Sequence, residues 1–155
     1  MPNRTRLVLA VLFPATFALH VTEEWLGGFP SFMALVSGRT MSETVFLNVN
    51  GVYLALVVIA VAVAAIRSGF DWIYPGLATV ILFNTATHLS GAAFVRAYSP
   101  GLVTALSLWI PLGTWVARSS WRRLPRPTFW GGVTAGAVTM VGVGLLALPL
   151  SRPVP

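Results

Sequence analysis

The stretch VLAVLFPATFALHVTEEW, Val8–Trp25, has twelve uncharged residues followed by His20, Glu23 and Glu24 near its end. About 20 mostly apolar residues in a helix cross the ~30 Å hydrocarbon core of a bilayer, and this stretch with its flanks has that length. Ionisable groups are costly in such a helix, and they mark a functional site more often than a structural one. The stretch therefore predicts a membrane-spanning helix with a polar site near one end.

The composition of the whole chain also indicates a membrane protein. Of its 155 residues, 56% are hydrophobic and 9% are charged, whereas soluble domains have about 45–50% apolar and about 25% charged residues. Cysteine is absent, which excludes disulfide bonds and thiolate metal sites. All ten basic residues are arginines that lie between the apolar runs. This distribution is typical of membrane topology signals, so no nucleic-acid partner is expected.

Five apolar segments approach the length of a membrane span. They lie at about 6–27, 43–66, 73–97, 101–118 and 128–150. The fourth segment is the weakest, because it is short and contains Pro111, which is expected to kink it. The sequence predicts an all-α, polytopic membrane protein in which five transmembrane helices form one compact bundle and a single domain, residues 1–155.

The arginines predict the orientation of this bundle. One side of the membrane would carry Arg4, Arg6, Arg67, Arg118, Arg122, Arg123 and Arg126, and the other Arg39, Arg96 and Arg152. Positively charged loops stay in the cytoplasm, so the N-terminus is expected inside and the C-terminus outside.

Three segments bring polar side chains to one depth in the outer half of the bilayer. These are His20, Glu23 and Glu24 in the first segment, Asn48 and Asn50 in the second, and Asn84 and His88 in the third. Residues three or four apart share a helix face, so His20 can face one cavity with both glutamates, and Asn84 with His88. Only one of Asn48 and Asn50 can face that cavity, and the spacing does not show which.

Three motifs resemble the HXXEE-domain family of small bacterial membrane proteins. They are His20-Val21-Thr22-Glu23-Glu24, the N-x-x-x-H pattern of Asn84–His88, and Tyr98-Ser99-Pro100-Gly101. The resemblance extends from about residue 8 to about residue 117. It implies an integral protein of the bacterial cytoplasmic membrane and, because the family is largely uncharacterised, little about chemistry.

Metal binding is the hypothesis that the residues themselves favour. Imidazole and carboxylate are usual ligands of zinc and non-haem iron, and His20, Glu24 and His88 could hold one such divalent ion. Glu23 would then serve as the catalytic general base. Residues that orient the ligands or contact substrate would be Asn48, Asn50, Asn84 and Tyr98. The sequence thus predicts a membrane-embedded enzyme, a metal-dependent hydrolase or oxidoreductase, that acts on a lipid-like or other hydrophobic small molecule.

Three other hypotheses fit the same residues. The adjacent glutamates could perform metal-free acid–base chemistry as an isomerase or cyclase, because neighbouring carboxyls separate their pKa values. Intramembrane Glu and His side chains also serve proton-coupled carriers, although no internal repeat supports this class. Polar groups can instead hold a purely structural bundle together. In the last segment, Gly132-x-x-x-Gly136 predicts close helix packing, including a homodimer through these two glycines.

Overall fold

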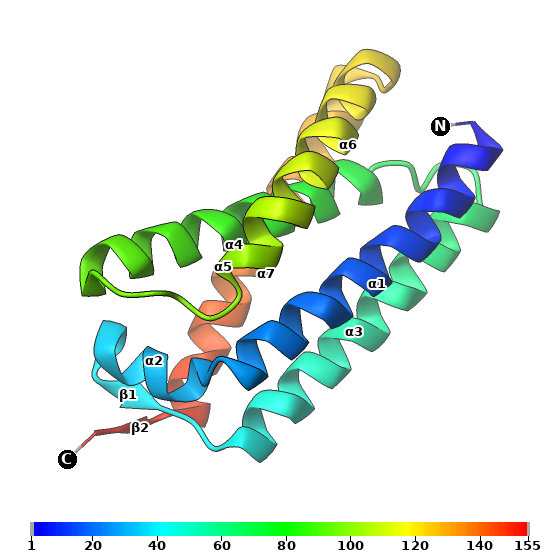
Figure 1. Ribbon diagram of the computed structural model, residues 1–155. Helices are drawn as coiled ribbons and strands as arrows, with labels where there is room; N and C mark the ends of the chain where they lie inside the picture. The colour runs from blue at the N-terminus through cyan, green and yellow to red at the C-terminus, as the bar shows by residue number, and fades with distance from the viewer. Residues whose placement is uncertain (1, 155) are drawn as a thin grey trace.

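The computed structural model describes residues 2–154, which form a bundle of long helices with one small pair of strands (Figure 1). The elements are α1 (Asn3–Leu26), α2 (Phe29–Ser37), β1 (Arg39–Thr40), α3 (Glu43–Ile66), α4 (Ile73–Val95), α5 (Leu102–Thr104), the π-helix η1 (Ala105–Trp109), α6 (Ile110–Arg123), α7 (Arg126–Leu150) and β2 (Arg152–Pro153).

Four of these helices, α1, α3, α4 and α7, are long and apolar enough to cross a membrane. They correspond to the first, second, third and fifth predicted segments. The predicted fourth segment is a continuous helical run from Leu102 to Arg123, divided by η1 into pieces of which the longest, α6, has 14 residues. The all-helical prediction is therefore confirmed, and four of the five predicted spans are helices of membrane-crossing length.

Pro111 accounts for the division of this fourth helical run. Proline lacks the N–H that an α-helix needs, and its ring crowds the carbonyl four residues earlier, which here belongs to Ser107. The π-helix ends at Trp109, and Pro111 falls in the first turn of α6, where a missing N–H is tolerated. The distortion expected at Pro111 thus takes the form of one wider turn, which buries Trp109.

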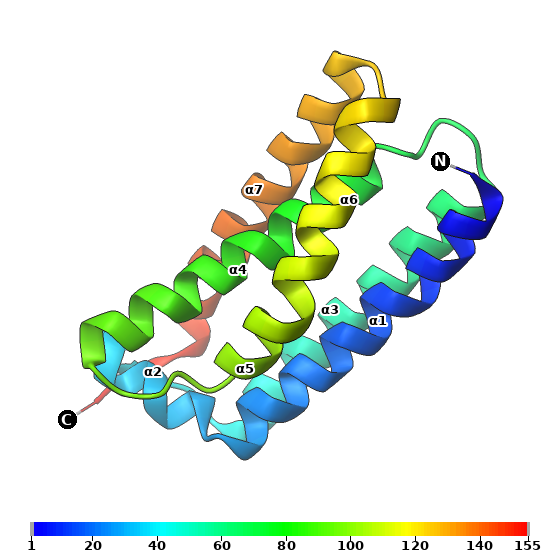
Figure 2. The same ribbon diagram turned by 45° about the horizontal axis from the view of Figure 1, so that its top comes forward.

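Two groups of helices enclose the core. In one group α1 lies beside α3, and in the other α4 contacts α6 and α7 (Figure 2). Leu9, Phe13, Val61, Tyr74 and Trp109 fill the space between them and are almost completely buried. Many large apolar side chains instead point outward, as expected where the surrounding solvent is lipid.

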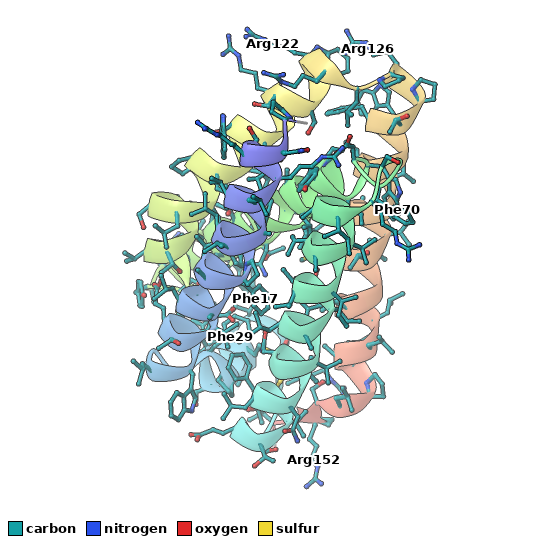
Figure 3. All side chains as sticks on the ribbon, turned by 90° about the vertical axis from the view of Figure 1, so that its right-hand side faces the viewer. Phe17, Phe29, Phe70, Arg122, Arg126 and Arg152 are labelled. Carbon is teal, nitrogen blue, oxygen red and sulfur yellow. The ribbon has the colours of Figure 1, made fainter. Side chains whose placement is uncertain are left out.

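A contact near each chain end fixes that end of the bundle to a distant part of the sequence. At the end that holds the N-terminus, the Arg6 guanidinium donates to the Asp71 carboxylate at 2.8 Å. At the other end, here called the strand end, β1 pairs with β2 in antiparallel orientation. Figure 3 shows Arg122 and Arg126 at the end of the molecule opposite to Arg152.

Arg39 secures the last turn of α7 at the strand end. Its Nε donates to Ser151 Oγ at 2.8 Å, and its Nη2 donates to the carbonyl oxygens of Leu148 and Ser151 at 2.8 and 2.7 Å. A cation at a helix C-terminus satisfies carbonyls that have no partner within the helix. Arg39 thus holds α7 against the loop that precedes α3.

Glycines bring α4 and α7 into close contact. A Cβ atom on Gly132 would lie 2.2 Å from the carbonyl oxygen of Trp72, and one on Gly136 would lie 2.3 Å from that of Gly76. Gly132-x-x-x-Gly136 is therefore a packing motif within one chain. Both glycines contact α4 of the same chain, and the homodimer through them stays a prediction.

Gly136→Ala is expected to destabilise the bundle, because the new methyl group would meet the backbone of α4 rather than a movable side chain. Overpacking of this kind costs about 1–3 kcal/mol. Gly142→Ala is the matched control, since a Cβ there meets open space on the same helix, and alanine should be neutral or stabilising by up to about 1 kcal/mol. Thermal unfolding in detergent measures the difference, and equal stability of the two variants would contradict it.

Candidate metal centre

His20, Glu24 and His88 come together at the strand end of the bundle. His20 and Glu24 share one face of α1, one turn apart, and His88 extends from α4. Glu24 Oε1 lies 3.5 Å from His20 Nε2 and 3.2 Å from His88 Nε2. All three residues are at least 95% buried, and one potential ligand atom from each lies within 4.8 Å of the others. Their convergence agrees with the depth and face expected from the sequence.

A hydroxyl group orients each imidazole ring. Thr104 Oγ1 lies 2.9 Å from His20 Nδ1, and Ser99 Oγ lies 3.0 Å from His88 Nδ1. The Thr104 hydroxyl also donates to the Gly101 carbonyl at 3.2 Å, which makes its oxygen available as an acceptor for His20 Nδ1–H. With Nδ1 as the donor, a neutral His20 carries its lone pair on Nε2. That nitrogen has no hydrogen-bond partner among residues 2–154.

This arrangement places electron-rich atoms opposite one another. His20 Nε2 lies opposite Glu24 Oε1, and a neutral imidazole acceptor and a carboxylate at this distance repel unless a metal ion or a proton lies between them. Metal–ligand bonds of about 2.0–2.2 Å in a tetrahedral site separate neighbouring ligands by roughly 3.3–3.6 Å. The separations of 3.5 and 3.2 Å are close to that range. The three ligands would leave one coordination position open, as catalytic zinc sites do.

Residues 98–104, YSPGLVT, form one wall of this cluster. They comprise the turn after α4 and the three residues of α5, and we call them the 98–104 turn. Gly101 has φ +95°, and a Cβ atom on it would lie 2.8 Å from Cε1 of both His20 and His88 and 2.9 Å from Glu24 Cγ. Only glycine has both the backbone freedom and the small size that this position requires. The backbone of the turn therefore lies directly against all three candidate ligands.

Glu23 points away from the cluster and caps α5. Its Oε1 accepts hydrogen bonds from the Tyr98 hydroxyl and, at 2.9 Å, from the Val103 N–H. Its Oε2 accepts one from the Thr104 N–H at 2.7 Å. Carboxylates stabilise helix N-termini because the first N–H groups there have no partners within the helix. Partial burial and the Glu23 carboxylate raise the pKa of Tyr98 to about 12, so its hydroxyl stays a donor.

The asparagines differ in their relation to the cluster. Asn50 and Asn84 line a cavity of about 250 Å³ together with Glu24, whereas Asn48 is exposed and does not line it. Asn50 Nδ2 donates to the Phe46 carbonyl at 3.0 Å. Asn84 Oδ1 is buried and has no hydrogen-bond partner within the described part of the chain. Asn50 is therefore the member of its pair that faces the site.

Helix α2 lies where the sequence indicates only a loop, and it separates two cavities at the cluster. Phe29 and Met33 of α2 line both the cavity of about 250 Å³, here called the site cavity, and a second cavity of about 170 Å³. Glu24 and Asn84 also line both. The Phe29 ring lies 5.7 Å from that of His88. Mostly apolar cavities thus adjoin the candidate ligands.

Trp109, Ser99, Gly101 and Thr104 contact the candidate ligands although sequence analysis assigns them no role at the site. The indole of Trp109 stacks on the His20 ring with a centroid separation of 3.7 Å. Two of the four belong to the YSPG motif, of which only Tyr98 was predicted to act at the site. The polar residues of this motif, directly after the helix of His88, are the signal that could have indicated their role.

Comparison with known proteins identifies one family model that matches the chain. It is described as a protein of unknown function with HXXEE motif, and it covers residues 11–116. The matched region contains His20, Glu24, His88 and the whole 98–104 turn, and it ends before α7. No curated protein and no solved structure is significantly similar to the chain.

Proposed function

The chain belongs to the HXXEE family, and from this premise we propose that it is a membrane-embedded enzyme that binds one divalent metal ion through His20, Glu24 and His88. The observation that carries this proposal is the convergence of three buried ligand atoms, with each imidazole oriented by a hydroxyl group through its other nitrogen. Such outer hydrogen bonds are typical of metal-binding histidines. Two histidines and one carboxylate suit Zn²⁺ or non-haem Fe²⁺.

The open coordination position would take a water molecule or a substrate oxygen. A bound divalent ion acidifies such a water and polarises such an oxygen, which supports hydrolysis or oxidation–reduction of a hydrophobic small molecule. Asn50 and Asn84 would bind a polar group of the substrate, because their side chains lie in the site cavity next to Glu24. The free Oδ1 of Asn84 offers an acceptor there.

We assign Glu23 the role of a positioning residue in place of the general base favoured by the sequence. Its two carboxylate oxygens receive three hydrogen bonds from the 98–104 turn. That turn also supplies the hydroxyl partners of both histidines. Glu23 would therefore act on the metal ligands through the backbone that it holds, and Tyr98 would act with it.

Metal-free acid–base catalysis is the second candidate function. Glu24 Oε1 lies near both imidazole Nε2 atoms, and a shared proton could replace the metal ion as the cation between them. The same three residues would then pass protons to and from a hydrophobic substrate, as in an isomerase or cyclase.

Elemental analysis of the detergent-purified protein tests the proposal. We expect about one divalent ion per chain in the parent protein and almost none in His20→Ala, because two remaining ligands hold an ion far more weakly. Thr22→Ala is a matched control on the same helix, since the Thr22 hydroxyl bonds only the Ala18 carbonyl. A parent protein that folds and binds no Zn²⁺ or Fe²⁺ would favour the acid–base candidate.

We further propose five membrane passes, with the N-terminus in the cytoplasm and the strand end outside. The alternation of helix directions and the opposite positions of Arg126 and Arg152 support this topology (Figure 3), as does the excess of arginine at the N-terminal end. A reporter fused after Pro155 should lie outside, and one inserted at Leu124 should lie in the cytoplasm. Both reporters on one side would overturn the five-pass topology.

A further inference from the structure

Another cavity, different from the two described above, lies farther along the bundle from the metal centre than the site cavity. Its volume is about 260 Å³, and it is lined by α3, α4 and α7 through residues that include Tyr53, Ala60, Trp72, Val80 and Thr139. Its lining has no charged side chain. We call it the distal cavity. The site cavity has walls on the same three helices, in addition to α1 and α2.

The two cavities lie next to one another along the same three helices. On α3 the lining passes from Asn50 in the site cavity to Tyr53 in the distal cavity, three residues later. On α4 it passes from Asn84 to Val80, one helical turn away. Val143 and Thr139 make the same step on α7. All three helices therefore continue the lining from one cavity to the other by about one turn, and we call the two adjoining cavities together the groove between α3 and α7.

The length of this groove matches a lipid chain. From Asn50 to Ala60 the α3 wall covers ten residue steps, or about 15 Å at the helical rise of 1.5 Å per residue. This is about half of the ~30 Å hydrocarbon core of a bilayer, and so about the depth of one leaflet. A chain in the groove would therefore be as long as the hydrocarbon tail of a membrane lipid.

The charged and amide side chains of the groove lie at one of its ends, just as the polar group lies at one end of a single-chain lipid. The only charged residue that lines it is Glu24, and it lies with Asn50 and Asn84 at the site end. The groove is also open at its side, because Leu56 lines the distal cavity and is 56% exposed. A hydrocarbon chain could enter sideways from the bilayer without crossing water.

We propose that the groove between α3 and α7 binds a single-chain membrane lipid, with its hydrocarbon tail in the distal cavity and its polar end in the site cavity beside Glu24, Asn50 and Asn84. This inference rests on the proposed function for the chemistry at the polar end. It names the substrate class of that site as single-chain amphiphiles, with chain length selected by the distal cavity.

Photolabelling with straight-chain alcohols tests the groove directly. The probes are a long-chain alcohol and a short-chain alcohol, each with a diazirine at the methyl end, added to the protein in vesicles of phosphatidylcholine. The long probe should label peptides that contain Tyr53, Ala60 or Thr139, and the short probe should label peptides of the site cavity, such as the one with Phe46 and Asn50. Labelling spread evenly over the outward faces of all helices would overturn the inference.

Filling the distal cavity gives the decisive comparison. Ala60→Phe places a ring in the cavity, whereas Ala55→Phe adds the same ring at an exposed α3 position outside it. We expect Ala60→Phe to lower long-probe labelling of the Tyr53 and Thr139 peptides about tenfold, because the added ring takes up the space of the chain end. Short-probe labelling and Ala55→Phe should match the parent protein. Equal long-probe labelling in both variants would refute the groove.

A second cavity-filling variant and the metal content of each variant complete the experiment. If Ala60→Phe does not fold, Thr139→Phe fills the same cavity from α7 and carries the same expectation. Metal content is measured on every variant, because the metal ligands do not touch the distal cavity. Chain-length selection without bound metal would support the groove and overturn the metal enzyme, whereas bound metal without chain-length selection would overturn the groove alone.

Discussion

On the proposed function, Glu24→Gln should abolish metal binding, while Glu23→Gln should retain most of it. Among residues 2–154, Glu24 supplies the only carboxylate that lies within 4 Å of both His20 and His88, and a neutral amide is a much poorer ligand for a divalent ion. We expect its loss to weaken metal binding by at least about 100-fold, since even outer partners of metal ligands contribute about 10–100-fold. Zinc titration of metal-stripped protein measures this change.

Glu23→Gln should act mainly on stability. The amide can replace only one of the two carboxylate oxygens that cap α5, and loss of a helix cap costs about 0.5–2 kcal/mol. Metal affinity should fall by about tenfold at most, through a looser 98–104 turn. Reversed effects of the two substitutions would exchange the roles of the glutamates. Full metal binding by both variants would mean that the metal lies outside this cluster.

The positions of the membrane-length helices along the chain could be predicted, because they depend on local sequence. Apolar length alone placed α3 at 43–66, and the segment predicted at 128–150 lies within α7. Helix α2 could not be found in this way, because its nine residues are too few to cross a bilayer. Its bounds depend on Gly28 and Gly38, both in the left-handed region, which the sequence also allows in a loop.

The candidate ligands were predictable for a similar reason. His20 and Glu24 are one turn apart on a helix, and depth in the membrane brings His88 to the same level. The contacts of the Glu23 carboxylate were not predictable, since its partners are the Val103 and Thr104 N–H groups about 80 residues later in the chain. The choice between Asn48 and Asn50 likewise depends on the rotation of α3 about its axis, which its nearly uniform apolar surface does not reveal.

Gly101→Ala should disrupt the metal centre although residue 101 is not a ligand. The new methyl group would lie within 2.9 Å of carbon atoms in His20, Glu24 and His88 at once. Relief of these contacts must move either the ligands or the 98–104 turn, which also orients both imidazoles. Metal affinity should fall on the order of 100-fold, because ligand geometry and the outer hydrogen bonds are lost together.

Gly69→Ala separates this steric effect from backbone strain. Gly69 has φ +89°, close to the +95° of Gly101, but a Cβ atom on it meets open space. Both substitutions carry the same left-handed penalty of about 1–2 kcal/mol, so both variants should lose similar stability from strain. Only Gly101→Ala should lose metal, as measured by zinc titration of folded, monodisperse protein. Equal metal affinity in the two variants would show that the turn does not position the ligands, because the ligands would then have tolerated a methyl group in the space where they meet.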